Sequence, residues 1–249
     1  MAIDVNKVYR VVLAITNKEQ RGYLTPDQFN RIARQAQLDI YEKTFYDYNR
    51  AMRKQAVGDF REYSDIASNI KDKIDIFARQ SNLTISDQTG IGSIVSSLDL
   101  YRLIGVYGTN RLNEFEEVRK EELPYLLNSK LNQPTSAYPV YYSEANTIRV
   151  FPADGGDFYG TSLIIDYITY PSDPRWGYTT GGSGQLVYNS TAYDPNTQPN
   201  GSTNFEIHES DETDLVIKIL AYTGIIIKDP TVIQSAAQKE VNDFNQDNL

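Results

Sequence analysis

The residues best suited to nucleophilic chemistry gather around His208, in the stretch EIHES at 206–210. His208 is the only histidine of the 249-residue chain and there is no cysteine, so any scheme with a histidine base must use it. Glu206, Glu209 and Ser210 stand beside it. A strand is expected to end and a helix to begin here, which favours a surface or capping histidine over a catalytic one. A single histidine without cysteine also excludes the usual zinc frameworks.

Carboxylates and glycine-rich stretches give no stronger motif. The acidic turn DGGD at 154–157 lacks the twelve-residue spacing of a calcium loop. TGIGS at 89–93 lacks the third glycine of a dinucleotide fingerprint, and GGSG at 181–184 lacks the lysine of a phosphate loop, so both predict flexible connections. Four clustered glutamates are typical of a solvated face: Glu116, Glu117, Glu121 and Glu122. We therefore predict no catalytic residue, no metal site and no cofactor.

The charge balance limits the possible partners. The chain has 33 acidic and 24 basic residues, a net charge of −9 and a pI near 4.7. Such a surface repels phosphate backbones, which argues against non-specific nucleic-acid binding. The longest apolar stretch, LVIKILAYTGIII, contains Lys218 and is too short to span a bilayer, and charged residues follow Met1 where a signal peptide would need an apolar region. We expect a soluble protein made in the cytoplasm, without a membrane partner.

Nineteen tyrosines make the chain rich in a residue that is common at interfaces and also in sheets. The single tryptophan, Trp176, lies in YPSDPRWGY at 170–178, where two prolines favour a stiff, extended path. Two interpretations remain open: Trp176 fills a groove on an adjacent subunit, or it is an intramolecular plug that closes the sheet. On the first interpretation the candidate subunit or partner interface consists of Tyr170, Pro171, Pro174, Arg175, Trp176, Tyr178, Tyr188 and Tyr193.

The elements that must position these residues begin with helices. Asp4 is a candidate N-cap for a helix that ends at Gly22, and its predicted buried face contains Val5, Val8, Val12 and Ile15. Thr25, Pro26 and Gln28 predict a capping box at the start of a helix over 26–56. Gly58 interrupts the pattern, and the apolar spacing then predicts a third helix over 59–79. At the other end, Ser210 is the candidate cap of a helix that ends near Lys228, before a last helix through 230–244.

The middle of the chain has the pattern of strands. We predict a loop from Asn82, a strand in LYRLIGVYG, a strand end and short helix over 115–131, a hairpin over 138–152 and a strand in TSLIIDYITY. No helix of crossover length separates these strands, which favours an antiparallel meander. Residues 171–204 predict a long loop excursion with an internal hairpin around QLVYN.

The predicted fold class is therefore α+β: a helical bundle formed by N- and C-terminal helices, plus a central antiparallel sheet or small barrel with a long loop excursion. We expect an N-terminal helical part at 1–81, a β-rich part with its loop arm at 82–204, and C-terminal helices at 205–249 that pack on the first part.

The order of these features resembles the head-to-tail connector (adaptor or ring) proteins of short-tailed bacteriophages, most closely those of crAss-like Bacteroides phages. The resemblance is carried by four blocks: NKEQRGYLTPDQFNRIARQAQLDIYEK at 17–43, YPVYYSEANTIRVFP at 138–152, IDYITYPSDPRWGY at 165–178 and FEIHESDETDLVIKILAYTGIIIKDP at 205–230. It implies a virion protein without enzymatic activity, a subunit of a closed, often twelvefold ring that contacts the portal and other tail proteins. Genomic DNA would pass through the channel without specific binding.

Two alternatives come from other classes. Aromatic loops with carboxylates also suit sugars, so a carbohydrate-binding or carbohydrate-acting tail protein would show an aromatic cleft with two carboxylates at glycosidase spacing. A monomeric cytoplasmic scaffold is the third hypothesis.

Overall fold

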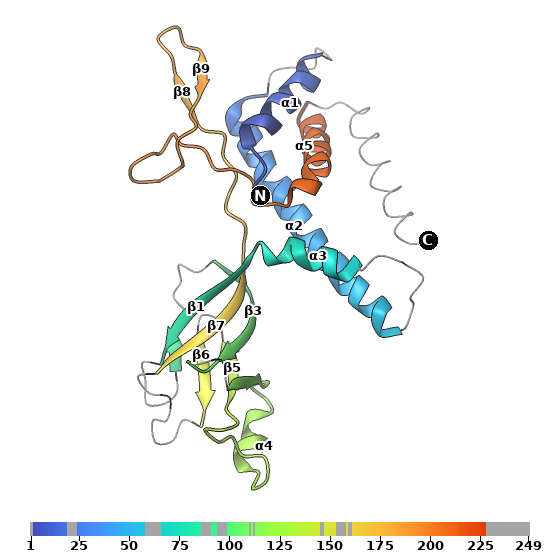
Figure 1. Ribbon diagram of the computed structural model, residues 1–249. Coiled ribbons are helices and arrows are strands. Elements are labelled where there is room, and N and C mark those ends of the chain that lie inside the picture. Colours follow the sequence, from blue (N-terminus) through green and yellow to red (C-terminus); the bar gives the residue numbers. More distant parts are fainter. Residues whose placement is uncertain are drawn as a thin grey trace. The chain divides into compact units, whose positions relative to one another are not determined.

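The computed structural model describes residues 2–18, 24–57, 66–85, 91–93, 99–109, 111, 113–144, 147–152, 158 and 161–227. The chain forms two units (Figure 1). The helical unit contains residues 1–76 and 171–249, and the β unit contains residues 77–170. The predicted excursion at 171–204 therefore belongs with the helices, and the expected boundaries at residues 81/82 and 204/205 do not coincide with those of the units. Each unit has its own apolar core.

The helical unit consists of α1 (Val5–Lys18), α2 (Pro26–Val57), α3 (Ile66–Asp75), a 3₁₀ turn η2 (Glu209–Asp211) and α5 (Glu212–Ile227). Both predicted N-terminal caps are confirmed. Asp4 Oδ1 accepts the N–H of Asn6 at 2.9 Å. Thr25 Oγ1 accepts the N–H of Gln28 at 3.3 Å, and Gln28 Oε1 accepts the N–H of Thr25 at 3.1 Å. This reciprocal pair is the capping box, which fixes where α2 begins.

The core of the helical unit lies where α1, α2 and α5 meet. Val5, Val8 and Val12 are fully buried, as predicted, but Ile15 is 41% exposed. Thr16 is buried instead, because a helix of 3.6 residues per turn returns to the same face four positions after Val12. The largest buried apolar side chains contributed by α2 and α5 are Phe29, Ile32, Ile40, Leu215 and Ile219.

Within the described residues, the β unit is a sheet of seven strands in the order β1-β7-β3-β4-β5-β6-β2. Figure 1 shows that this sheet is curled. Its strands are β1 (Ala78–Thr84), β2 (Ile91–Ser93), β3 (Leu100–Tyr107), β4 (Glu114–Glu117), β5 (Val140–Glu144), β6 (Thr147–Phe151) and β7 (Ser162–Thr169). The hairpin predicted over 138–152 is confirmed as β5 and β6, with Val140 opposite Phe151. A short helix, α4 (Leu123–Asn128), follows β4, with Pro124 in its first turn as predicted.

The α+β fold class is confirmed, but the strand order differs from a simple meander. β7, the last strand of the unit, lies between β1 and β3. The β4 and β5 strands are parallel, because the segment with α4 carries the chain back between them. All other pairs in the sheet are antiparallel.

The predicted helix over 59–79 is wrong at its C-terminal end. α3 ends at Asp75, and Ala78 already pairs with Ile168 in β7. The loop predicted from Asn82 is wrong in the same way, since β1 continues to Thr84, and residues 91–93 of TGIGS form β2. Pairing with β7, about 80 residues away, overrides a local composition rich in Ser, Asn and Thr.

Some predictions lie outside the described residues: the helix end at Gly22, the break at Gly58, the DGGD turn and the helix over 230–244. Within the described part of the chain, no helix is both long enough and apolar enough to cross a membrane.

Candidate functional site

The segment 171–176, which we call the strap, is fixed to α2 by two buried or partly buried amides. The side chain of Asn30 donates to the carbonyl of Trp176 at 3.4 Å and accepts its N–H at 2.8 Å. Gln37, only 1% exposed, donates to the carbonyl of Ser172 at 2.8 Å and accepts the N–H of Glu206 at 3.2 Å. Asn30 and Gln37 are seven residues apart, so they lie on the same helix face. α2 thus supplies hydrogen bonds to the strap at Ser172 and Trp176, and between them Arg175 pairs with the backbone of Thr203.

Two charged contacts accompany these amides. Arg34 Nε lies 2.9 Å from Asp173 Oδ1, but both side chains are 60% exposed, so the ion pair adds little stability. The carboxylate of Glu206 accepts the N–H of Ser172 at 2.8 Å. Gln37 also binds the backbone of Glu206. One α2 side chain therefore connects the strap to the segment that follows the excursion at 171–204.

Trp176 is 6% exposed and belongs to the core of the helical unit. Its ring centroid lies 4.4 Å from that of Tyr9 on α1, and 5.8 Å from those of both Tyr178 and Tyr188. The indole Nε1 donates to Asn6 Oδ1 at 3.2 Å. Trp176 is therefore an intramolecular anchor, and it completes the helical core where we had expected it to close the sheet or to fill a neighbour's groove.

Beyond the anchor, residues 177–203 form what we call the arm. Its hairpin consists of β8 (Tyr178–Thr180) and β9 (Leu186–Tyr188), which confirms the predicted internal hairpin (Figure 1). A second loop follows, closed by the Asp194–Gln198 bridge. In that loop the Thr197 hydroxyl and the N–H of Asn196 donate to the Asp194 carboxylate, which lowers its pKa.

The base of the arm is a close crossing of backbones that requires glycine. A Cβ on Gly177 would lie 2.2 Å from the carbonyl oxygen of Gly201, and one on Gly201 would lie 2.6 Å from that of Ala192. Ser202 Oγ joins the crossing strands: it accepts the N–H of Gly177 at 2.9 Å and donates to the carbonyl of Asn189 at 2.5 Å. The arm is thus tied at its root.

The remaining predicted interface residues fall into three environments. Tyr170 belongs to the β unit, where it is 47% exposed and packs edge-on against Tyr101 at 4.9 Å. Pro171 and Pro174 are buried in the strap. Arg175 lies 4.6 Å over the ring of Tyr193, which is 40% exposed. The structure gathers Trp176, Tyr178 and Tyr188 into one aromatic stack and leaves Tyr170 out of it.

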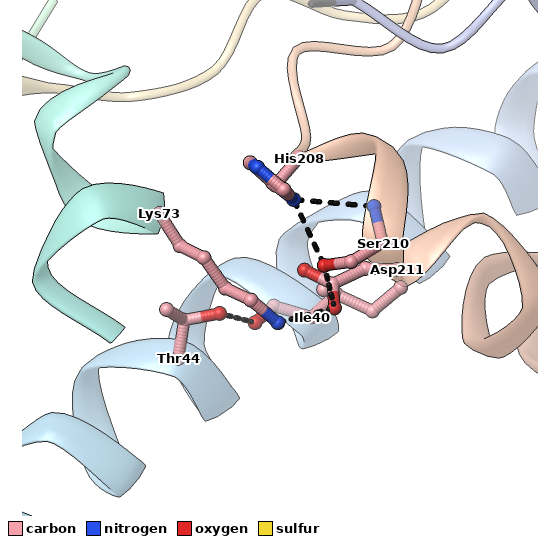
Figure 2. Close-up of polar contacts among 6 residues, drawn as sticks. All are labelled: Ile40, Thr44, Lys73, His208, Ser210 and Asp211. Atoms are coloured by element: carbon pink, nitrogen blue, oxygen red, sulfur yellow. Dashed lines mark hydrogen bonds and ion pairs between the residues drawn. The ribbon is translucent and has the colours of Figure 1, made fainter. Parts of the chain in front are cut away.

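His208 is a helix cap (Figure 2). Its Nδ1 accepts the N–H of Ser210 at 3.1 Å and lies 2.8 Å from the Ser210 hydroxyl. The carboxylate of Asp211 accepts from Ser210 Oγ at 3.3 Å and pairs with Lys73 at 2.6 Å, so it does not orient the imidazole as a catalytic triad requires. The cap of this region is His208, in the place that we had predicted for Ser210.

A cleft of about 230 Å³ lies beside the strap and is lined mainly by polar groups. Its lining includes Asp27, Asn30, Arg175 and the residues of β8. Asp27 is the only carboxylate among these lining residues. In the part of the chain that the structure describes, no three His, Asp or Glu side chains are placed to hold a metal ion.

Comparison with protein-family models gives no match to this chain, and comparison with curated proteins gives none either.

Sequence reasoning missed the residues that hold the arm: Asn6, Asn30, Gln37, Gly177 and Gly201. A signal for two of them was present, because Asn30 and Gln37 interrupt an otherwise apolar face of α2 at a spacing of seven. A polar residue on a buried face needs a hydrogen-bonding partner, and in this chain both partners are backbone groups of the strap.

Proposed function

We propose that this chain is a structural subunit of a head-to-tail connector ring of a short-tailed bacteriophage, as the resemblance of its sequence implies. Its partners would be further copies of itself, the portal protein and other tail proteins, within the virion. No catalytic role is proposed for any residue.

The observation that carries this proposal is the arm. A closed ring needs a surface on each subunit that meets a different surface on the next. The arm supplies such a surface. Its root packs on the core of the helical unit through Tyr178 and Tyr188, whereas Leu186 and Val187 in β9 are 39% and 46% exposed. Fixing the root in advance reduces the entropy lost when the arm meets a neighbour.

The acidic composition also suits a DNA channel. A ring repeats the net charge of −9 in every subunit, and carboxylates that face the lumen would repel phosphates and let the duplex slide.

Native mass spectrometry, on the chain alone and with its portal protein, tests the proposal. We expect a closed oligomer of defined copy number, formed alone or on the portal. A chain that stays monomeric at high concentration and does not bind the portal would contradict the proposal.

The alternative, a carbohydrate-binding or carbohydrate-acting tail protein, draws on the cleft beside the strap. Two features weaken its support: Asp27 is the one carboxylate among the described residues of the lining, and the Trp176 ring already contacts three tyrosines. Glycan binding by the monomer, measured on an array and by calorimetry, would favour this alternative.

A further inference from the structure

The hairpin of the arm is short and packs little on the described part of its own chain. Each strand has three residues, and among the described strands β8 and β9 pair only with each other. Tyr178 and Tyr188 pack on Trp176, but that contact lies at the root of the hairpin. A two-stranded hairpin is marginally stable in water, and a further strand or an apolar cover stabilises it.

The composition of the hairpin is unusual for an exposed edge. From Trp176 to Tyr193 the sequence contains no Asp, Glu, Lys, Arg or Pro, although 23% of the whole chain is charged. Soluble proteins commonly place charges or proline on open edge strands, because these residues block pairing with other chains. The hairpin lacks this protection and exposes Leu186 and Val187 as well.

The hydrogen bonds within the hairpin indicate which backbone N–H and C=O groups are free to bond to another strand. Gly181 donates to Gln185 and Asn189 donates to Gly177, so these pairs hydrogen-bond across the hairpin. In an antiparallel pair the hydrogen-bonded positions alternate with positions whose N–H and C=O groups point outward. Leu186, opposite Thr180, takes the outward position in β9. An incoming strand could therefore bond to the backbone of Leu186.

We propose that the hairpin Tyr178–Tyr188 docks on a second copy of this chain, where its strand edge pairs with backbone and Leu186 and Val187 become buried. This inference rests on the proposed ring and identifies one of its contacts. The charge of the chain selects the occupant. Two copies, each with a net charge of −9, repel each other, and an uncharged hairpin can approach an acidic copy without adding to that repulsion. A basic partner or a nucleic acid would be matched by acidic or basic side chains, which the hairpin does not have.

The test is the oligomeric state of the full chain by mass photometry and sedimentation, with the double variant Leu186→Asp/Val187→Asp. We expect self-association at least 100-fold weaker than in the wild type. The matched control is Leu131→Asp in the β unit, where Leu131 is 95% exposed, and it should associate as the wild type does. The fluorescence of Trp176 reports whether the strap remains folded in each variant.

Hydrogen exchange on the wild type gives a second measurement that needs no substitution. The amide of Leu186 should be protected in the oligomer and exchange freely on dilution to the monomer. The hairpin inference is wrong, while the ring proposal stands, if the double variant still forms the oligomer. The same holds if the Leu186 amide exchanges equally fast in the oligomer and in the monomer. If the hairpin variant assembles but no longer binds the portal, the occupant is a different protein and the inference is also wrong. A wild type that never self-associates overturns it outright, and portal binding then decides the proposed function separately.

Discussion

Asn30 holds both backbone groups of Trp176, since its amide accepts the N–H at 2.8 Å and donates to the carbonyl at 3.4 Å. A side chain on a helix thus performs the pairing that a neighbouring strand usually provides. The geometry of the arm depends on this contact, because Trp176 is the last residue before the arm begins.

Replacing Asn30 with Ala should lower the free energy of unfolding by about 2 kcal/mol, because two hydrogen bonds are lost and a partly buried N–H is left unsatisfied. Chemical denaturation followed by the single tryptophan measures the change. Arg34→Ala is the control on the same helix, and its exposed ion pair predicts a loss of less than about 1 kcal/mol. Equal losses in the two variants would mean that the amide has no special role.

Trp176→Ala should destabilise the monomer by about 4 kcal/mol, because it empties a site enclosed by Tyr9, Tyr178 and Tyr188. Circular dichroism during thermal unfolding measures the loss. The comparison is Tyr193→Ala, which removes an exposed ring and its contact with Arg175, and which should cost about 1 kcal/mol or less. A stable Trp176→Ala monomer would contradict the anchor role.

Gly177→Ala should cost about 3 kcal/mol or more, since its Cβ would overlap the backbone of Gly201 and the crossing strands would have to separate. Gly182→Ala, in the turn of the same hairpin, meets nothing within 4 Å and should be nearly neutral. Urea denaturation of both variants tests the difference. The prediction is wrong if both alanines are tolerated alike.

His208→Ala should cost about 1 kcal/mol, the usual value of an N-terminal cap, because the N–H of Ser210 loses its acceptor. His208→Asn supplies another acceptor and should recover most of the stability. Thermal unfolding of the three proteins measures the effect, and a loss in the Asn variant equal to that in the Ala variant would contradict a capping role.

Burial raises the pKa of Tyr141 in the β unit to about 12. The folded state therefore favours the neutral phenol, so its contribution is full below about pH 10 and is lost as the pH rises toward 12. Tyr141→Phe cannot ionise, and it should flatten the fall in stability between these values. Urea midpoints at pH 9, 10 and 11 for both proteins measure the slope. Parallel slopes would show that Tyr141 does not contribute.

Local signals in the sequence predicted the elements whose ends depend on neighbouring residues. The capping box of Thr25 and Gln28 placed the start of α2, and the β-branched run in TSLIIDYITY placed β7. In β1, Ala78 and Arg79 were assigned to a helix and the residues from Asn82 to a loop, because this strand forms by pairing with the distant β7. Long-range pairing of this kind is invisible to periodicity.

The candidate site was predicted only in part, again because its contacts join residues that are far apart in the sequence. The prolines and aromatics of the strap predicted a stiff path, but Trp176, predicted as a candidate interface residue, lies in the core of its own chain. Its partners are Asn6, Tyr9 and Asn30, about 150 to 170 positions away in the chain, and no short motif encodes such contacts. The crossing of Gly177 and Gly201 was missed because a glycine among many turn residues does not reveal how near another backbone passes.

The chain enters and leaves the β unit at adjacent points, since Thr169 donates to the carbonyl of Phe77 at 3.1 Å and Ala78 pairs with Ile168. The whole sheet is therefore an insertion whose two ends meet, and a short turn can bridge them at little entropic cost. A related protein could lose, enlarge or exchange this insert without rebuilding its helices.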